Sequence, residues 1–373
     1  MTTISRSERR ASHLAGMLGI ALSCSLIFLA ACSRQDLPGI AEERVPPGEA
    51  AEIERVVSMF TDAIEARDDG ELTRRGAHPK HHGCVHGNFA IDADLPAELQ
   101  VGVFQAGASY PVWIRFSNNA DPQADIEADV RGMALKLLEV DGSKLFEPDP
   151  NARTQDFLLV SHPVFVFPDV ATYSQAFEAF ADDRALSFFF NPFDSHLRAF
   201  MIVREMLARH ADLLDLRWFS MVAYRFGDGR AVKYSASPCV RANTPLPQTP
   251  PDDFLARQLG ARLAADDACF EFSVQFQSDA ASMPIEDPSR KWSESRSPFI
   301  PVAKIEIPAQ AFDSPGRMAF CENLSFNPWR VLPEHRPLGG ISRARRVIYD
   351  EISKFRRDRN RIVADEPRNL MVD

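Results

Sequence analysis

The chain has 373 residues, a length that suggests two or three domains, although β-barrel folds often run longer as a single unit. A hydrophobic content of 45% and a charged content of 25% exclude wholesale disorder, a fibrous repeat and a polytopic membrane protein. The formal net charge of -10 disfavours nonspecific binding to nucleic acid, so we expect no nucleic-acid partner and only local basic sites.

The first 31 residues have the pattern of a secretory signal. Three arginines precede an apolar run over residues 14–31 that ends in small residues. The segment Leu29-Ala30-Ala31-Cys32 resembles a bacterial lipobox, in which the cysteine is lipidated and becomes the first residue of the mature chain. We therefore predict a signal peptide over residues 1–31 and lipidation of Cys32, with an uncleaved membrane anchor as the alternative.

Residues 32–50 contain three prolines, two glycines and several charges, which predicts a flexible tether. We therefore expect an exported, membrane-anchored lipoprotein of the bacterial envelope that faces the periplasm. Ser33 is not the aspartate that commonly retains lipoproteins at the inner membrane, so the outer membrane is favoured. An oxidising compartment permits two disulfides among four remaining cysteines, but no spacing selects a pairing of Cys84, Cys239, Cys269 and Cys321.

Residues 51–373 show no linker and no repeat, which favours a single α+β domain. Apolar spacing predicts a helix over residues 49–69, and short β-branched and aromatic runs predict strands between residues 88 and 167. The pattern is helical over 169–218, and strand-like runs return at 231–234, 270–276 and 302–307. The last 30 residues are predicted to form a basic helix. The strands indicate an antiparallel sheet or barrel.

The segment His78-Pro-Lys-His81-His82-Gly-Cys84-Val-His86 holds four of the nine histidines. Neutral imidazoles and a thiolate are ligands for zinc, copper or nickel, although the spacing matches no metal motif. A polar loop with incidental histidines is a second interpretation. The third is one working histidine in a cavity, which needs partners elsewhere in the chain.

The C-terminal helix offers such a partner in Tyr349. Helical periodicity places Arg345 one turn before Tyr349 on the same face. A phenol has an ordinary pKa of about 10, so it needs help to become an anionic metal ligand, and an adjacent guanidinium favours the phenolate. A surface helix with solvated side chains is the alternative. An apolar stripe would hold the helix against a core through Ile341, Ala344, Ile348, Ile352 and Phe355.

Ordered motifs over about residues 74–360 resemble the haem catalase family, and in particular its short, catalase-related members. Leu324-Ser-Phe326-Asn-Pro328, followed by Arg345 and Tyr349, is similar to the end of the catalase domain. Ile285-Glu-Asp-Pro-Ser-Arg-Lys-Trp292 is similar to an upstream catalase segment. Tyr110-Pro-Val-Trp-Ile-Arg115-Phe-Ser117, Asp129-Val-Arg131-Gly132 and His162-Pro163-Val-Phe165 resemble elements that line the distal pocket. The resemblance implies an antiparallel β-barrel with surrounding helices and one haem b.

The resemblance also assigns roles. Tyr349 would ligate the haem iron with Arg345 beside it, and His78 would be the distal histidine. His81 and His82 are rivals for that role, because the loop after His78 needs one extra residue to align. Ser117 would hydrogen-bond the far ring nitrogen of His78 and fix its tautomer. Three arginines would pair with the haem propionates, and two aromatic residues would flank the haem: Arg75, Arg115 and Arg356, and Phe165 and Tyr173 respectively.

Two positions depart from the family. Val160 stands where catalases have the distal asparagine, and valine cannot donate a hydrogen bond to peroxide. Ala77 is small where a bulky valine narrows access in catalases. We therefore expect a haem-dependent oxidoreductase that acts on hydrogen peroxide or an organic hydroperoxide. The alternative is a non-enzymatic lipoprotein, haem-binding or haem-free, that keeps the catalase scaffold.

Overall fold

The computed structural model describes residues 38–66, 70, 72–119, 123–363 and 365–371. Residues from Gly39 to the C-terminus form one compact unit. The predicted signal peptide and Cys32 lie outside the described residues. Within the described ranges, no helix is long and apolar enough to span a bilayer.

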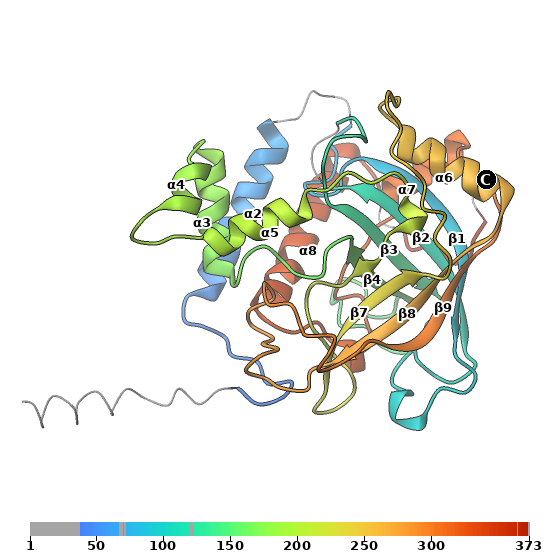
Figure 1. The fold of residues 1–373 in the computed structure, drawn as a ribbon, viewed down its shortest axis with the longest axis horizontal. Coiled ribbons are helices and arrows are strands. Elements are labelled where there is room, and N and C mark those ends of the chain that lie inside the picture. Colours follow the sequence, from blue (N-terminus) through green and yellow to red (C-terminus); the bar gives the residue numbers. More distant parts are fainter. Residues whose placement is uncertain (1–37, 67–69, 71, 120–122, 364, 372–373) are drawn as a thin grey trace, which may run out of the picture. The chain divides into compact units, whose positions relative to one another are not determined.

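Eight antiparallel strands form a closed barrel, as predicted (Figure 1). The order is β5-β4-β3-β2-β1-β9-β8-β7, and β5 pairs with β7 to close the ring, while β6 extends from β7. The strand bounds are β1 His81–Ile91, β2 Ser109–Asn118, β3 Arg131–Leu138, β4 Thr154–Val160, β5 Trp218–Phe219, β6 Tyr224–Arg225, β7 Ala231–Pro238, β8 Ala268–Phe276 and β9 Ile300–Ile307.

The first strand begins within the histidine segment, seven residues before the predicted strand region. Its glycines are unfavourable in strands, so the sequence pattern does not indicate a strand here. At position 87 a glycine is required, because a Cβ there would lie 2.3 Å from the carbonyl oxygen of Glu306 on β9. Side chains alternate between the two faces of each strand. On β2, Ile114 and Phe116 join the aromatic barrel core, whereas Trp113, Arg115 and Ser117 face outward. The outer face of β1 to β4 is therefore available for polar chemistry.

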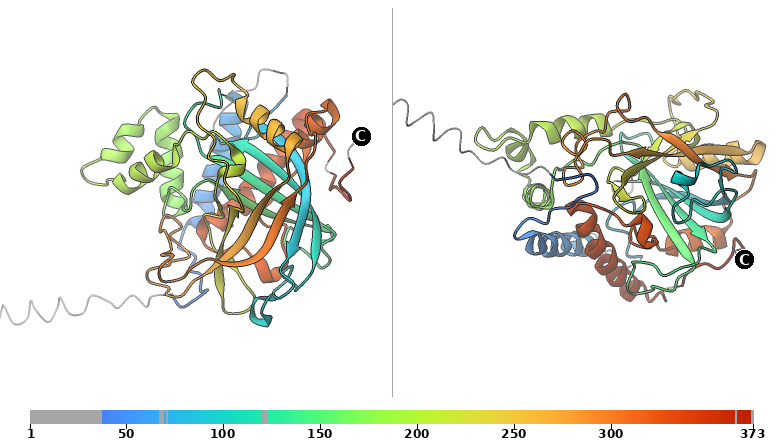
Figure 2. Two further views of the ribbon diagram at one scale, coloured as in Figure 1. Left: turned by 45° about the vertical axis from the view of Figure 1, so that its right-hand side comes forward. Right: turned by 90° about the horizontal axis from the view of Figure 1, so that it is seen from below.

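Seven helices in the described part of the chain lie outside the barrel, and α4 and α5 project away from it (Figures 1 and 2). Their bounds are α2 Glu49–Ala66, α3 Val170–Ala181, α4 Ala185–Phe190, α5 Leu197–Met206, α6 Phe254–Ala265, α7 Pro315–Asn323 and α8 Gly340–Asn360. Short 3-10 turns occupy Ala97–Leu99, Leu213–Asp215 and Pro333–His335. Helix α8 buries four residues of the predicted apolar stripe, and α2 packs beside α3 and α8.

The prediction of a helix over the last 30 residues is wrong at its end. Helix α8 stops at Asn360, where Arg361 adopts a left-handed conformation with φ 53°. The tail then crosses the outer face of the barrel: Trp113 Nε1 donates a hydrogen bond to the Asn369 carbonyl at 3.1 Å, and Glu366 contacts Lys136 at 2.8 Å. Sequence periodicity could not show these long-range contacts.

Two disulfides, which the sequence did not assign, join distant segments. Cys84 on β1 bonds to Cys321 on α7, and Cys239 bonds to Cys269 on β8. The part of the predicted tether that the structure describes lies against the domain. The backbone nitrogen of Ala41 donates to Gln277 at 2.7 Å, and that of Arg44 donates to Glu286 at 2.8 Å.

Candidate functional site

His78 lies against the outer wall of the barrel, just before β1. Its Nδ1 is 3.1 Å from Ser117 Oγ on β2. Its backbone is in the left-handed region at φ 56°, which is uncommon for a residue other than glycine and often marks a functional position. Gly132 makes room for the ring, because a Cβ there would lie 2.6 Å from the imidazole.

The environment keeps the His78 imidazole neutral. Burial lowers its pKa to about 3, and the positive charges of Arg115, Arg345 and Arg75 act in the same direction. The residue before it, Ala77, is exposed. A neutral imidazole held at one nitrogen by a hydroxyl can accept a proton at the other.

The two rival histidines lie in different surroundings. His82 is fully buried, and its Nε2 is 2.7 Å from Asn118 Oδ1, within a network that includes Asp125. His81 Nε2 lies 3.6 Å from a carboxylate oxygen of Glu322, and burial lowers its pKa to about 3. Neither histidine has the hydrogen bond to Ser117 that His78 has.

No group of three or more His, Cys, Asp or Glu side chains in the described ranges is arranged to hold a metal ion. Cys84 is committed to its disulfide, so it offers no thiolate. The zinc interpretation of the histidine segment therefore has no ligand set among the residues that can be described.

Val160 shares a row with the residues around His78. Ser117 pairs with Gly132 across β2 and β3, and Gly132 pairs with Val160 across β3 and β4. Directly paired residues present their side chains on the same face of a sheet. Val160 therefore contributes an apolar side chain to the wall that borders His78. The next residue, Ser161, accepts a hydrogen bond from the backbone nitrogen of Arg131 at 3.0 Å.

Tyr349 and Arg345 occupy neighbouring turns of α8, as predicted. Arg345 donates from Nη2 to Tyr349 Oη at 3.3 Å and lies over the phenol ring, with its guanidinium carbon 5.3 Å from the ring centroid. Arg345 also acts on Tyr224 and Tyr173, both of which have a pKa that burial raises above its ordinary value. Sequence reasoning missed Tyr224, because nothing in the sequence links β6 to α8.

The aromatic pair predicted to flank a cofactor lies beside this helix. Phe165 and Tyr173 meet edge to face with ring centroids 5.4 Å apart, and both are half-buried. Tyr173 lies on α3, which packs against α8. Tyr349 and Arg345 both influence the pKa of the Tyr173 phenol, so Tyr173 lies near these two side chains of α8.

Three guanidinium groups and one carboxylate form what we call the arginine cluster: Arg75, Arg115, Arg356 and Glu322. Arg356 donates to Glu322 Oε1 at 2.6 Å, and Arg75 donates to the carbonyls of Glu322 and Leu324 at 2.9 and 2.7 Å. Burial lowers the pKa of Arg75 to about 10, with further lowering by Arg356. The cluster brings together residues from both ends of the domain.

The arginine cluster has more positive charge and more hydrogen-bond donors than its own residues satisfy. Among the described residues, Glu322 is the one carboxylate that acts on these arginines. The buried Nε atoms of Arg75 and Arg115, and Nη1 of Arg345, have no hydrogen-bond partner within the described part of the chain. Buried donors of this kind normally have partners. Two carboxylates, such as the propionates of a haem, would balance the charge and accept these bonds.

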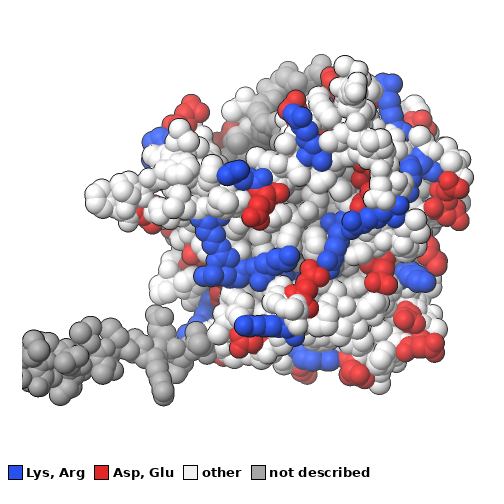
Figure 3. Space-filling model, viewed as in Figure 1, with Lys and Arg blue, Asp and Glu red and all other residues white. Residues whose placement is uncertain are grey.

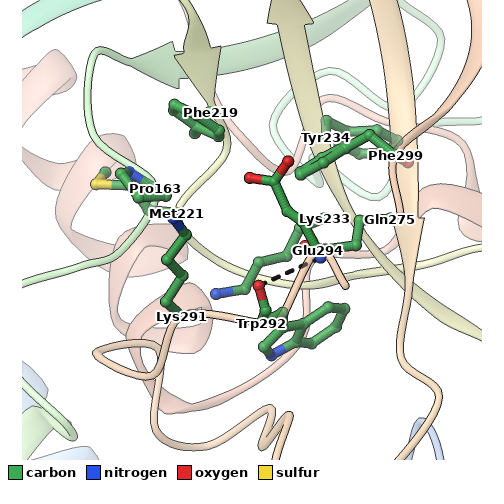
Figure 4. Close-up of a pocket in the computed structure, with 10 residues that line it drawn as sticks. All are labelled: Pro163, Phe219, Met221, Lys233, Tyr234, Gln275, Lys291, Trp292, Glu294 and Phe299. Carbon is green, nitrogen blue, oxygen red and sulfur yellow. Dashed lines mark hydrogen bonds between the residues drawn. The ribbon is translucent and has the colours of Figure 1, made fainter. Parts of the chain in front are cut away.

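A separate narrow cavity lies between β7, β8 and the segment around Trp292 (Figure 4). Lys233 is buried beside it with Nζ 5.1 Å from the Trp292 ring centroid, and burial lowers its pKa to about 7. Gln275 donates to the Trp292 carbonyl at 3.3 Å across the cavity wall. None of the predicted site residues lines this cavity.

These features define a closed antiparallel barrel with a polar site on its outer wall, faced by a helix that carries an arginine-bound tyrosine. No family model matches the sequence. Solved structures share the fold: a fungal catalase aligns with a TM-score of 0.60 at 15% identity, covering 79% of this chain and 62% of that chain. Catalase A from Saccharomyces cerevisiae aligns with a TM-score of 0.62 at 16% identity, covering 80% and 64%. The fold is therefore catalase-like, and the chain spans less than two thirds of the length of these catalases.

Proposed function

We propose that this protein binds haem b and converts peroxides. The observation that carries the proposal is that Ser117-bonded His78 and Arg345-bonded Tyr349 lie around an arginine cluster with unsatisfied donors. Haem has an iron that needs an axial ligand and two carboxylates that need cations. Tyr349 would supply the ligand, and the arginine cluster would supply the cations. When bound, the haem would supply the redox chemistry that cleaves the peroxide O–O bond.

Tyr349 would serve as the iron ligand, and Arg345 would stabilise its anionic form through the hydrogen bond to Oη. Arg75, Arg115 and Arg356 would hold the propionates. Bidentate guanidinium groups suit carboxylates, and burial strengthens such contacts by excluding water. Phe165 and Tyr173 would supply apolar contact at the edge of the cofactor.

His78 would transfer protons during the reaction. With Nδ1 engaged by Ser117, its Nε2 would accept the proton from a peroxide and return it to the leaving oxygen. Ser117 is a positioning residue in this scheme, because it orients the ring without touching the substrate. The neutral state of His78 fits a proton acceptor.

Val160 bears on which peroxide is used. An apolar side chain in the row beside His78 cannot donate to peroxide, and loss of one preorganised donor typically costs about 100-fold to 1,000-fold in rate. Disproportionation of hydrogen peroxide handles two peroxides in each cycle and should suffer most. We infer slow oxygen release from hydrogen peroxide and better turnover of organic hydroperoxides.

Val160 also favours a second candidate, a non-enzymatic haem-binding lipoprotein that keeps the scaffold. The two candidates differ in a single experiment. Haem-loaded protein with an organic hydroperoxide should show turnover that His78→Ala abolishes and His86→Ala retains. A haem spectrum without turnover of hydrogen peroxide or of the organic hydroperoxide would support the non-enzymatic candidate. Rapid oxygen release from hydrogen peroxide without turnover of the organic hydroperoxide would reject our choice of substrate.

Haem binding itself is tested by absorption spectroscopy of purified protein reconstituted with haem. Tyr349→Phe should abolish the ferric tyrosinate spectrum, whereas Tyr110→Phe on β2 should leave it unchanged. Tyr224→Phe is a poor control, because Arg345 contacts Tyr224. An unchanged spectrum in the Tyr349 variant would contradict the assignment of the iron ligand.

We also propose that the protein is exported and anchored by a lipid at Cys32, with the outer membrane favoured. The lipobox-like sequence supports this, as do two disulfides, which persist in oxidising compartments and are rare in the cytosol. Mass spectrometry of protein purified from membranes should show a mature chain that begins at acylated Cys32. An unmodified Cys32 would reject the anchor.

A further inference from the structure

Helices α4 and α5, with the loop that joins them and the end of α3, form a projection that we call the helical lobe, residues 180–207. Figures 1 and 2 show it extending away from the barrel. A small core separate from that of the barrel joins the lobe to α3, and in it Phe188 and Phe189 cluster with Ala199 and with Ala176 of α3. The lobe therefore holds its shape without covering the barrel.

The outside of the helical lobe is unusually apolar. Of the sixteen exposed large hydrophobic residues among the described ranges, seven lie in these 28 positions. Phe193 is 97% exposed and Leu186 is 74% exposed. The other five are Phe180, Phe190, Leu197, Met201 and Leu207. Contiguous apolar surface of this kind marks an interaction site.

The loop at residues 286–289 contacts both the N-terminal segment of the domain and the base of helix α5. The backbone nitrogen of Arg44 donates to Glu286, and three residues further on, the Ser289 carbonyl accepts a 2.6 Å hydrogen bond from Arg198 on α5. Only seven positions separate Cys32 from Gly39, so this part of the domain can lie at most about 25 Å from a lipid on Cys32. In the left view of Figure 2 the lobe lies at the upper left, and the first described residues lie below it at the lower left.

Basic side chains lie beside the apolar surface. Arg198 on α5 is neighboured by the exposed Arg290 and Lys291, with Asp287 as the carboxylate near Arg198 and Arg290. Figure 3 shows Lys and Arg side chains gathered next to the largely white lobe. Within the lobe itself the charges are mixed, because Arg184, Arg198 and Arg204 are accompanied by Asp182, Asp183, Asp194 and Glu205. The exposed rings therefore carry the contact by entering the acyl boundary, and Arg198, Arg290 and Lys291 would meet anionic headgroups.

We propose that the helical lobe is a second membrane contact, which inserts Leu186, Phe190 and Phe193 into the bilayer that holds the Cys32 lipid. The proposal rests on the proposed lipid anchor. Insertion would orient the domain, since a tether alone allows it to rotate freely. It would also place α3, which carries Tyr173 towards its first turn and Phe180 near its end, between the lipid surface and the candidate site.

The experiment uses the full acylated chain, reconstituted into vesicles of phosphatidylethanolamine and phosphatidylglycerol. Phe193→Cys is labelled with an environment-sensitive fluorophore, and Val240→Cys serves as a control, since Val240 is 77% exposed and apolar but lies outside the lobe. The four described cysteines are in disulfides and would not react. We expect a blue shift and quenching by lipid-borne quenchers at position 193 only.

A second variant tests the apolar contact directly. With the label on Met201→Cys, which is also in the lobe, Leu186→Asp together with Phe193→Asp should remove the blue shift while the protein stays on the vesicles. Both side chains are exposed, so the fold should be retained, as checked by circular dichroism. Protein that is anchored through Cys32 but has an aqueous label at 193 would overturn the lobe proposal and leave the anchor standing. A concentration-dependent blue shift without vesicles would overturn it in favour of self-association.

Discussion

Two buried clusters of charge on the outer face of the barrel differ in their balance. In what we call the lysine network, Lys136 and Arg330 each contact both Asp156 and Glu366, at 2.7 to 3.2 Å, so two cations meet two carboxylates. In the arginine cluster, three guanidinium groups meet one carboxylate. Buried ions are stable only when they are paired. The charges of the lysine network are therefore balanced within the fold, whereas the arginine cluster carries positive charge that Glu322 alone does not balance.

The largest expected effect follows from removing one cation of the lysine network. Lys136→Met would leave the fully buried Asp156 with less compensation, and breaking a buried ion pair costs about 3–5 kcal/mol of unfolding free energy. Urea unfolding measures the loss, which haem should not restore. Lys354→Met is the control, because its exposed pairs with Asp350 and Glu351 contribute little. Equal losses in both variants would contradict a structural role for the network.

In the arginine cluster, unlike the lysine network, haem should restore the stability that is lost when a charged residue is replaced. Glu322→Gln removes the sole carboxylate, so we expect the haem-free protein to lose about 2 kcal/mol through repulsion among the buried guanidinium groups. Haem should recover most of this loss, because bound propionates compensate the charge and ligand binding stabilises the folded state. Unfolding with and without haem provides the measurement. Glu366→Gln, in the lysine network, should lose stability that haem does not recover.

Acid should destabilise the haem-free domain through the histidines near the arginine cluster. Burial lowers the pKa of His78 and of His81 to about 3, whereas an unfolded histidine has a pKa of about 6.5. Below that value the unfolded chain binds more protons, so the unfolding free energy falls as the pH drops from about 6.5 towards 3. We expect a loss of about 1–2 kcal/mol per histidine between pH 7 and 5. The double variant His78→Gln, His81→Gln should show a flatter pH dependence, and an unchanged slope would exclude these two residues as the source.

The smallest expected effect concerns a single propionate contact. Arg75→Met should weaken haem binding about tenfold, the effect of losing roughly 1.4 kcal/mol of charge-assisted hydrogen bonding. The unloaded domain should change little, because the lost bonds to α7 are offset by relief of repulsion from Arg356. Haem titration measures the affinity. Arg346→Met provides the control on the exposed face of α8, and equal affinity in the two variants would remove Arg75 from the site.

Local patterns predicted elements whose side chains alternate regularly. The stripe on α8 was readable because this helix buries one periodic face. The runs in β2, β3 and β8 were readable as short apolar runs that turn-forming residues separate. The start of β1 was missed, since Gly87 is explained by its close approach to β9 and His82 by its contact with Asn118 rather than by strand propensity. The end of α8 at Asn360 was missed because the contacts of the tail with Trp113 and Lys136 are far apart in the sequence.

For the candidate site, the resemblance to catalases predicted pairs of residues that are in contact in the structure, namely His78 with Ser117 and Arg345 with Tyr349. It could not identify Glu322, whose importance lies in its pairing with Arg356 across 34 positions of sequence. Nor could it identify Tyr224, whose strand β6 bridges Pro337 just before α8 and so lies near Arg345. Charge balance among distant residues becomes visible only once the chain is folded.

The disulfide between Cys84 and Cys321 implies an order of maturation. The two cysteines are 237 positions apart, so the bond can form only after residue 321 has been synthesised and brought to the barrel. Helix α7, which this bond fastens to β1, presents the carbonyls that hold Arg75 and Arg356. In the proposed envelope location, thiol oxidation would therefore fix α7 against β1, and with it the carbonyl groups that orient these arginines. In a reducing cytoplasm, where this disulfide would not form, α7 would lack its covalent link to β1.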